Sequence, residues 1–339
     1  MLVKKPGITS KKAIATGIVL TTAFSTVGVS IALLFPNSAL AAKFNLDKID
    51  QIYTFGDSLS DTGNFFQQTG FPPSPYFQGR FSNGSVWIEY LTQSLGLPAI
   101  AQSNFAFGGA TTGTDNTVIP GFPGLQTEIG GFLASNPPVN PNALYVVWAG
   151  ANDYLGGGVT NPNEPVDRLA TAINSLAGFG AQNILVVNLP DLGQLPGTKN
   201  TPFETPLDIL SSAHNFGLAN KINQLQTTLG SDVNLISFDV NSLFRQAINN
   251  PQDFGFTNVT DSCLVGVTVC SKPNEYLFWD DIHPTTVGHQ AIANSAYETL
   301  QAASVPEPTF IVGTLSFGAY LAYSKKRQTK AKAKATANT

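Results

Sequence analysis

Residues that bind metals are scarce in this sequence. It contains two cysteines and three histidines among 339 residues, and their spacing matches no common ligand pattern. The usual structural zinc sites, which need four such ligands, are therefore excluded. Cys263 and Cys270 lie seven positions apart, so in an exported protein they could close a small disulfide loop, with two free thiols as the alternative.

Positive charge is also scarce away from the two ends of the chain. Four of the 18 lysines and arginines precede residue 13 and six follow residue 324, which leaves eight in the central region. Residues 42–304, which hold these eight, carry 21 acidic residues, so their formal charge is −13, although that of the whole chain is −4. Nucleic-acid binding requires clustered positive charge. We therefore expect no nucleic-acid partner.

Residues 1–41 have the pattern of a signal peptide. Four lysines precede an apolar run from Ala13 to Phe35, and Ala39-Leu40-Ala41 has the small-x-small form of a signal-peptidase site. We expect export with cleavage after Ala41. Because the apolar run is longer than a usual signal core, an uncleaved membrane anchor is the alternative.

Residues 305–339 form a second segment of the targeting type. Pro306-Glu307-Pro308 precedes an apolar run from Thr309 to Tyr323, and a basic cluster follows. This tail resembles the PEP-CTERM sorting signal of exported bacterial proteins, which implies transient or permanent membrane attachment. A plain anchor is the alternative, although the run is short for a full span. The basic end favours an exported body in the periplasm or outer envelope, at the cell surface or outside the cell.

The remaining residues, 42–304, have the length of one domain. Short runs of β-branched or aromatic residues predict buried strands at 52–55, 144–148, 184–187 and 233–238, with another near 99–105. Helical periodicity predicts helices at 86–95, 125–134, 166–176, 207–229 and 287–300, and turn residues predict loops at 70–84, 156–164 and 192–206. This alternation predicts an α/β fold with a parallel sheet of about five strands, covered on both faces.

The first predicted strand leads into Gly56-Asp57-Ser58-Leu59. Open parallel sheets bind ligands at the carboxyl ends of their strands. A serine in a strand-to-helix turn exposes its hydroxyl there, and neighbouring backbone N–H groups can stabilise an oxyanion. Gly-Asp-Ser is also common in ordinary turns and helix caps, so the motif alone is a weak signal. Ser58 is the candidate nucleophile.

A serine nucleophile needs a base, and the central region offers three histidines: His214, His283 and His289. His283 follows Asp280 by three positions, in a turn that Pro284 restricts. This spacing can place the carboxylate on one ring nitrogen while the other faces Ser58. Asp281 is the less well placed alternative partner. His214 and His289 fall within predicted helices, where packing or capping explains a histidine.

Two further segments can supply hydrogen-bond donors to a developing oxyanion. The glycine-rich stretch from Asn104 to Thr112 contains Gly109, whose backbone can approach a ligand closely. Asn152, just after a predicted strand, has a side-chain amide. A tight turn at Gly109 and an Asx turn at Asn152 are the structural alternatives.

Together these motifs resemble the GDSL/SGNH hydrolases. Gly56-Asp57-Ser58-Leu59, Asn104 to Thr112, Gly150-Ala151-Asn152-Asp153 and Asp280 to His283 occur in the order of that family across essentially the whole central region. The resemblance implies a three-layer α/β/α sandwich with a flavodoxin-like sheet. It implies Ser58 as nucleophile, His283 as base and Asp280 as its partner. The oxyanion donors would be Asn152, Gly109 and the Ser58 N–H, with Gly109 taken over Gly108 by counting from Asn104.

We therefore expect an exported serine hydrolase that cleaves lipid, phospholipid or short-chain acyl esters and needs no cofactor or metal. The chain has no Gly-x-Ser-x-Gly elbow, which argues against the α/β-hydrolase fold. An acetyl esterase on surface polysaccharide and a non-catalytic surface scaffold are the alternatives, and the oligomeric state stays open. Several aromatic residues near the predicted loops can line an acyl groove or pack in the core: Phe65, Phe66, Phe71, Tyr76, Phe77 and Phe81.

Overall fold

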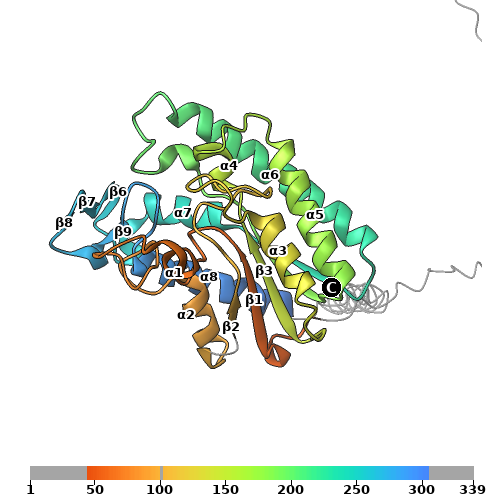
Figure 1. The fold of residues 1–339 in the computed structure, drawn as a ribbon. Coiled ribbons are helices and arrows are strands. Elements are labelled where there is room, and N and C mark those ends of the chain that lie inside the picture. The colour runs from red at the N-terminus through yellow and green to blue at the C-terminus, as the bar shows by residue number, and fades with distance from the viewer. Residues whose placement is uncertain (1–43, 100–101, 305–339) are drawn as a thin grey trace, which may run out of the picture. The chain divides into compact units, whose positions relative to one another are not determined.

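The computed structural model describes residues 44–99 and 102–304. The predicted signal peptide and sorting tail lie outside these residues. At the centre is a five-stranded parallel sheet in the order β2-β1-β3-β4-β5 (Figure 1). Its strands are β1 (Gln51–Gly56), β2 (Gln102–Asn104), β3 (Ala143–Trp148), β4 (Asn183–Val187) and β5 (Asn234–Phe238). The predicted sheet, its strand number and its parallel sense are confirmed.

Helices cover both faces of the sheet. One face packs against α2 (Trp87–Ser94), α7 (Val240–Asn249) and α8 (Thr286–Ser304). The other packs against α3 (Leu125–Ala134), α5 (Asn163–Phe179) and α6 (Glu204–Thr228). Two short helices, α1 (Asn64–Thr69) and α4 (Ala151–Leu155), follow β1 and β3, and single 3-10 turns lie at Leu46–Lys48, Leu192–Gln194, Pro251–Phe254 and Pro273–Glu275. Among the described helices, none is both long enough and apolar enough to cross a membrane.

The sequences of the central strands are continuous apolar runs because helices cover both faces of the sheet. All six residues of β3 are buried. Leu144, Val146 and Trp148 belong to the core on the α2, α7 and α8 side, whereas Tyr145 and Val147 belong to the core on the α3, α5 and α6 side. This alternation follows from the two-residue period of a strand.

The helix boundaries differ from the prediction where prolines occur. The helices α5 and α6 start at Asn163 and Glu204, so the first includes Pro165 and the second includes Pro206. Both prolines occupy the first helical turn, where a backbone N–H has no helical partner to lose. The predicted loops at 156–164 and 192–206 therefore end earlier than expected.

The sequence prediction missed α7, although its signals are present. Val240, Leu243, Phe244 and Ala247 form a buried stripe at helical spacing. The carboxylate of Asp239 caps the helix by accepting hydrogen bonds from the backbone N–H and the hydroxyl of Ser242, at 3.1 and 2.6 Å.

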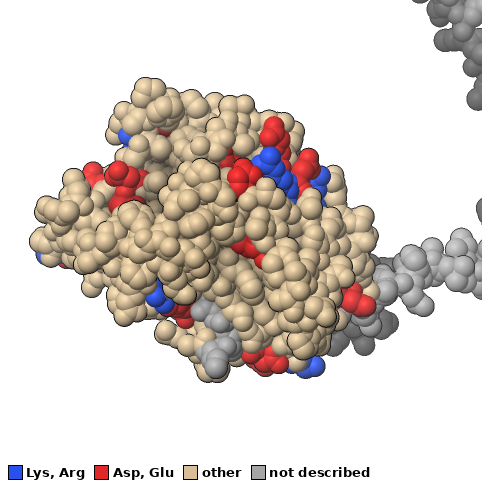
Figure 2. Space-filling view, viewed as in Figure 1, with Lys and Arg blue, Asp and Glu red and all other residues tan. Residues whose placement is uncertain are grey.

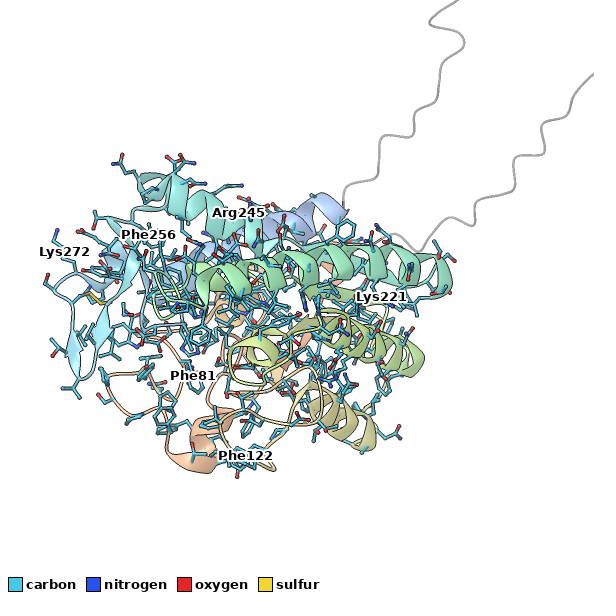
Figure 3. All side chains as sticks on the ribbon, turned by 90° about the horizontal axis from the view of Figure 1, so that it is seen from above. Phe81, Phe122, Lys221, Arg245, Phe256 and Lys272 are labelled. Carbon is cyan, nitrogen blue, oxygen red and sulfur yellow. A yellow bond between two sulfur atoms is a disulfide. The ribbon has the colours of Figure 1, made fainter. Side chains whose placement is uncertain are left out.

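A small β-region between α7 and α8 was also missed. The strand β6 (Asn258–Ser262) pairs with β9 (Tyr276–Phe278), and β7 (Leu264–Val265) forms a hairpin with β8 (Thr268–Val269). A disulfide between Cys263 and Cys270 closes this hairpin; it is the yellow bond near Lys272 in Figure 3. The backbone N–H of Leu264 donates to the carbonyl of Trp279 at 2.7 Å. The hairpin therefore lies against the segment that follows β9.

The end of β1 depends on a glycine. Gly56 pairs with Trp148 of β3 and has a φ of +148°. A Cβ atom added there would lie 2.0 Å from the Trp148 carbonyl oxygen. Only glycine lets the two strands approach this closely just before the Ser58 turn.

We expect Gly56→Ala to lower the free energy of unfolding by about 3 kcal/mol or more, because the new methyl group meets backbone that cannot move aside. Equilibrium denaturation in urea measures the loss. Gly130→Ala is the matched control, since Gly130 lies inside α3 and its added Cβ would touch nothing within 4 Å. Equal stability of the two variants would contradict the close-approach argument.

Candidate functional site

Four segments that are distant in the sequence meet at the carboxyl edge of the sheet. Ser58 follows β1, Gly109 lies in the loop after β2, Asn152 lies in α4 after β3, and His283 lies between β9 and α8. All four line one pocket of about 120 Å³. The structure thus brings together the candidate nucleophile, base and oxyanion donors.

Ser58 lies in a tight turn, and the next helix begins only at Asn64. The N–H groups of Ser60 and Asp61 both donate to the carbonyl of Asp57 at 3.0 Å, which closes this turn. The expected strand-to-helix turn is therefore a strand, a separate turn and then α1. Ser58 and His283 are each 9% exposed, so both reach the pocket although they are largely enclosed.

The side chains of Ser58, His283 and Asp280 form one hydrogen-bonded chain. The Oγ atom of Ser58 lies 2.9 Å from Nε2 of His283. Nδ1 of His283 lies 2.8 Å from Oδ2 and 2.9 Å from Oδ1 of Asp280. The Oδ1 atom also accepts hydrogen bonds from the backbone N–H groups of Ile282 and His283, at 2.9 and 2.7 Å. This arrangement can transfer the serine proton to the imidazole.

The carboxylate of Asp280 changes the proton affinity of His283. Burial alone would lower the pKa of His283, but the negative charge of Asp280 and its hydrogen bond outweigh burial and raise that pKa. Burial also acts to raise the pKa of Asp280. Its interactions with His283 and the backbone N–H groups nevertheless lower that pKa to about 2. Asp280 is therefore ionised wherever His283 titrates.

Two backbone N–H groups in the pocket are free of internal partners. Across residues 44–99 and 102–304, no protein acceptor takes a hydrogen bond from the N–H of Ser58 or of Gly109. The N–H of Gly108, by contrast, donates to Asp61 at 2.9 Å. Asn152 uses one amide hydrogen to reach the carbonyl of Ala110 at 3.0 Å, which leaves its second available. These contacts favour Gly109 over Gly108 as a donor to a bound oxyanion.

The loop that carries Gly109 requires a glycine there. Gly109 has a φ of +82°, and a Cβ would lie 2.6 Å from both Oδ1 of Asn116 and Cγ2 of Val118. Asn116 shapes this loop, since its amide donates to the carbonyl of Gly108 at 2.8 Å and its oxygen accepts from the N–H of Val118 at 2.9 Å. Asn116 was not among the residues that the sequence singled out.

Buried carboxylates connect the segments of the site, and the sequence prediction assigned them no role. Asp61 accepts hydrogen bonds from four backbone N–H groups, three in residues 63–65 and one in Gly108. Asp153 accepts from the N–H and hydroxyl of Thr112 at 2.8 and 2.7 Å. Glu128 of α3 accepts from the N–H of Gly56 at 2.8 Å. Their positions in the Ser58 and Asn152 motifs could have signalled the first two; nothing local marks Glu128.

Within the described residues, neither the other histidines nor the alternative carboxylate hydrogen-bonds to Ser58, and none of them lines its pocket. His214 of α6 is buried, with Nδ1 3.0 Å from the hydroxyl of Tyr154. His289 of α8 is buried with no hydrogen-bond partner for its ring among the described residues. Asp281 is exposed and accepts from the hydroxyl of Ser262 at 2.7 Å. Their positions agree with the packing interpretation.

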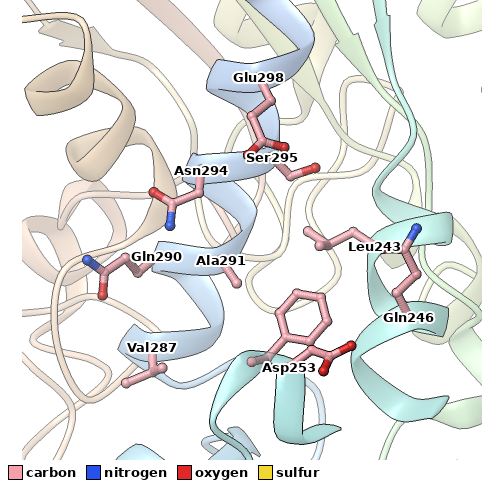
Figure 4. Close-up of a pocket in the computed structure, with 10 residues that line it drawn as sticks. Leu243, Gln246, Asp253, Val287, Gln290, Ala291, Asn294, Ser295 and Glu298 are labelled. Carbon is pink, nitrogen blue, oxygen red and sulfur yellow. The ribbon is translucent and has the colours of Figure 1, made fainter. Parts of the chain in front are cut away.

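A second pocket, of about 410 Å³, lies between α7, the 3-10 turn Pro251–Phe254 and α8 (Figure 4). Its lining includes Asp253, Ser295 and Glu298 but no histidine. It therefore lacks the serine and imidazole pair of the first pocket. Within the described part of the chain, no group of three or more histidine, cysteine or acidic residues is placed to hold a metal ion.

Comparison with known proteins places the chain in a family. The family description "GDSL-like Lipase/Acylhydrolase" matches residues 52–296. The chain is 32% identical over 303 residues to a phosphatidylcholine-sterol acyltransferase of Aeromonas hydrophila, covering 73% of this chain and 88% of that protein. It is 30% identical over 276 residues to a thermolabile hemolysin of Vibrio parahaemolyticus, covering 75% of this chain and 64% of the hemolysin.

Solved structures overlap with the chain more loosely. The aryl esterase of M. smegmatis shares 18% identity, with a TM-score of 0.45 over 75% of this chain and 99% of the esterase. The family match covers well over half of the chain and includes the positions of Ser58, Gly109, Asn152, Asp280 and His283. The protein therefore belongs to the GDSL-like lipase/acylhydrolase family and is a serine ester hydrolase.

Proposed function

We propose that the protein cleaves carboxylic esters through an acyl-enzyme on Ser58. The observation that carries this proposal is the hydrogen-bonded chain from Ser58 through His283 to Asp280, at 2.9 and 2.8 Å. With Nδ1–H directed at Asp280, Nε2 of His283 presents its lone pair to the serine hydroxyl. This is the protonation state that a general base requires.

The reaction proceeds in two halves. Nε2 of His283 accepts the Ser58 proton while Oγ attacks the acyl carbon, and the tetrahedral intermediate collapses as His283 protonates the leaving alcohol. Water then enters, His283 accepts one of its protons, and the resulting hydroxide attacks the acyl carbon. Collapse of the second intermediate releases the acid and returns the proton to Ser58. Throughout, Asp280 holds the imidazole ring and stabilises its protonated form.

The oxyanion forms beside the N–H groups of Ser58 and Gly109 and the amide of Asn152. All three residues line the pocket with His283. Because the two backbone donors have no internal acceptor among the described residues, neither must break a protein hydrogen bond to bind the oxyanion. Donors held in place before the reaction stabilise developing charge without reorganisation.

An apolar acyl group is the substrate portion that suits the pocket. The lining includes the apolar side chains Leu59, Phe81, Val118, Leu155 and Ile282. The ring of Phe81 lies 5.1 Å from that of His283 and also packs against Phe65. Figure 3 shows Phe81 from above, together with Phe122 of the same aromatic cluster. Of the aromatic residues considered above, Phe81 thus lines the pocket, whereas Phe65 is a core residue.

Lipid and phospholipid esters fit this lining, and the name of the Aeromonas relative, a phosphatidylcholine-sterol acyltransferase, supports the same choice. The small volume, about 120 Å³, favours short acyl groups such as acetyl as the second candidate. The face drawn in Figure 2 is mostly uncharged, with its charged residues in a few small groups.

We also retain the targeting assignments as proposals. Residues 1–41 direct export, 42–304 form the hydrolase domain, and 305–339 attach the protein to a membrane until the tail is processed. The support is the charge and hydropathy pattern of the two ends. Under this proposal the enzyme acts outside the cytoplasm, where the disulfide between Cys263 and Cys270 is stable.

Ser58→Ala should reduce hydrolysis of p-nitrophenyl esters by about 10⁶-fold in kcat, because among the described residues no other serine, threonine or tyrosine lines the pocket. The assay follows the visible absorbance of the p-nitrophenolate that is released. Rates on the acetate, butyrate and palmitate esters also rank short against long acyl groups. Ser271→Ala, at an exposed serine, is the control. Activity retained in Ser58→Ala would refute the assignment of the nucleophile.

The pH dependence should report the ionisation of His283. Since only neutral His283 can accept the Ser58 proton, kcat/KM should rise with pH through a pKa above the usual 6.5. In Asp280→Asn the midpoint should move to lower pH, and kcat should fall about 10³- to 10⁴-fold. Initial rates from about pH 5 to about pH 9 test both expectations. A profile that Asp280→Asn leaves unchanged would argue against Asp280 as the partner.

Asn152→Ala should lower kcat by about 10²- to 10³-fold and change KM little, because the lost donor acts mainly on the oxyanion. Steady-state kinetics on the best p-nitrophenyl ester separate kcat from KM. Asn163→Ala removes an amide from the exposed first turn of α5 and should have no effect. A change in KM alone would instead assign Asn152 to substrate binding.

A further inference from the structure

The two oxygen atoms of Asp280 have different surroundings. Oδ1 accepts hydrogen bonds from the backbone N–H groups of Ile282 and His283. Oδ2 accepts none from the described backbone; apart from Nδ1 of His283, its partner is the hydroxyl of Tyr76, which donates at 2.7 Å. The orientation of Oδ2 therefore depends on a side chain that comes from another part of the chain.

Tyr76 is held in place by the disulfide hairpin and its neighbours. It lies in the loop between α1 and α2, 204 positions before Asp280. Its ring meets that of Trp279 nearly edge-on, with 6.0 Å between centroids. Both rings belong to a cluster that includes Cys263 and Cys270. The hydroxyl is thus directed at Asp280 by packing outside the pocket.

We propose that Tyr76 is a positioning residue that orients the Asp280 carboxylate and tunes the basicity of His283. The proposal rests on the proposed function, since it takes His283 as the base. A hydroxyl that donates to Oδ2 draws negative charge away from the side of the carboxylate that faces Nδ1. It also restricts rotation of the carboxylate, which keeps the imidazole aligned with Ser58.

The tyrosine hydroxyl stays protonated while it does this. Burial, together with the charge of Asp280 and the hydrogen bond to it, raises the pKa of Tyr76. Other ionisable groups face these residues. The charge of Asp281 raises the pKa of Tyr76, and that of Asp57 raises the pKa of His283. The charge of His283 in turn lowers the pKa of His289. Burial raises the pKa of Asp57 to about 7, so this carboxylate titrates in the same range. Because a change at Tyr76 leaves all three in place, their effects are common to the variant and the parent.

Tyr76→Phe removes the hydroxyl and retains the ring that packs on Trp279. Without its donor, Oδ2 should hold the protonated imidazole more strongly, so the acid limb of kcat/KM should move to higher pH by about half a unit. At the plateau, kcat should fall about tenfold because the carboxylate is less restrained. KM should change little, since Tyr76 does not line the pocket.

Tyr276→Phe is the matched control. Tyr276 belongs to the same cluster, and its hydroxyl makes no hydrogen bond to a described residue. Its profile should coincide with that of the parent enzyme. A Tyr76→Phe profile that also coincides with the parent, or one displaced to lower pH, would overturn the proposal and leave Tyr76 a packing residue.

The double variant Tyr76→Phe with Asp280→Asn separates this proposal from the proposed function. If Tyr76 acts through Asp280, the tenfold loss and the pH shift should disappear in the Asp280→Asn background. Persistence of the full effect there would refute action through Asp280. If Asp280→Asn alone has no effect, the assigned triad fails instead, whatever Tyr76→Phe does.

Discussion

The close approach of β1 and β3 at Gly56 and Trp148 is the constraint on which the site depends. These two strands are adjacent and parallel, so the segments that follow them leave the sheet at the same edge. Ser58 follows one strand and Asn152 the other. A wider separation of the strand ends would move the nucleophile away from an oxyanion donor. The absence of a side chain at position 56 therefore helps to set the separation of the segments that carry Ser58 and Asn152.

Buried carboxylates stabilise the loops at this edge. Short loops leave backbone N–H groups without strand or helix partners, and such groups are costly when buried. Asp61 satisfies four of them and joins the segment after Ser58 to the Gly108 loop. Asp153 does the same between α4 and Thr112. These two acids account for part of the acidic composition of the chain, and neither lines the Ser58 pocket.

The base is stabilised from a different direction. His283 lies outside the main sheet, between β9 and α8, and its partner Asp280 is held by local backbone N–H groups on one oxygen and by Tyr76 on the other. The small β-region with its disulfide packs against Tyr76 and Trp279. The proposed nucleophile, Ser58, is thus positioned by the parallel sheet, whereas the proposed base, His283, is positioned by an appended structure that the sheet topology does not require.

The sequence by itself determined the sheet, most of the helices and the candidates for the reactive residues. Strand and helix periodicity are local patterns, and the order of the four motifs carries the family resemblance, so Ser58, Gly109, Asn152, Asp280 and His283 could be named without coordinates. Tertiary structure decided which N–H groups remain free, since the N–H of Gly108 donates to Asp61 whereas that of Gly109 has no acceptor among the described residues. It also decided the contact of Tyr76 with Asp280, which joins positions 204 residues apart. No local pattern encodes such a contact, because it depends on where packing places two loops in space.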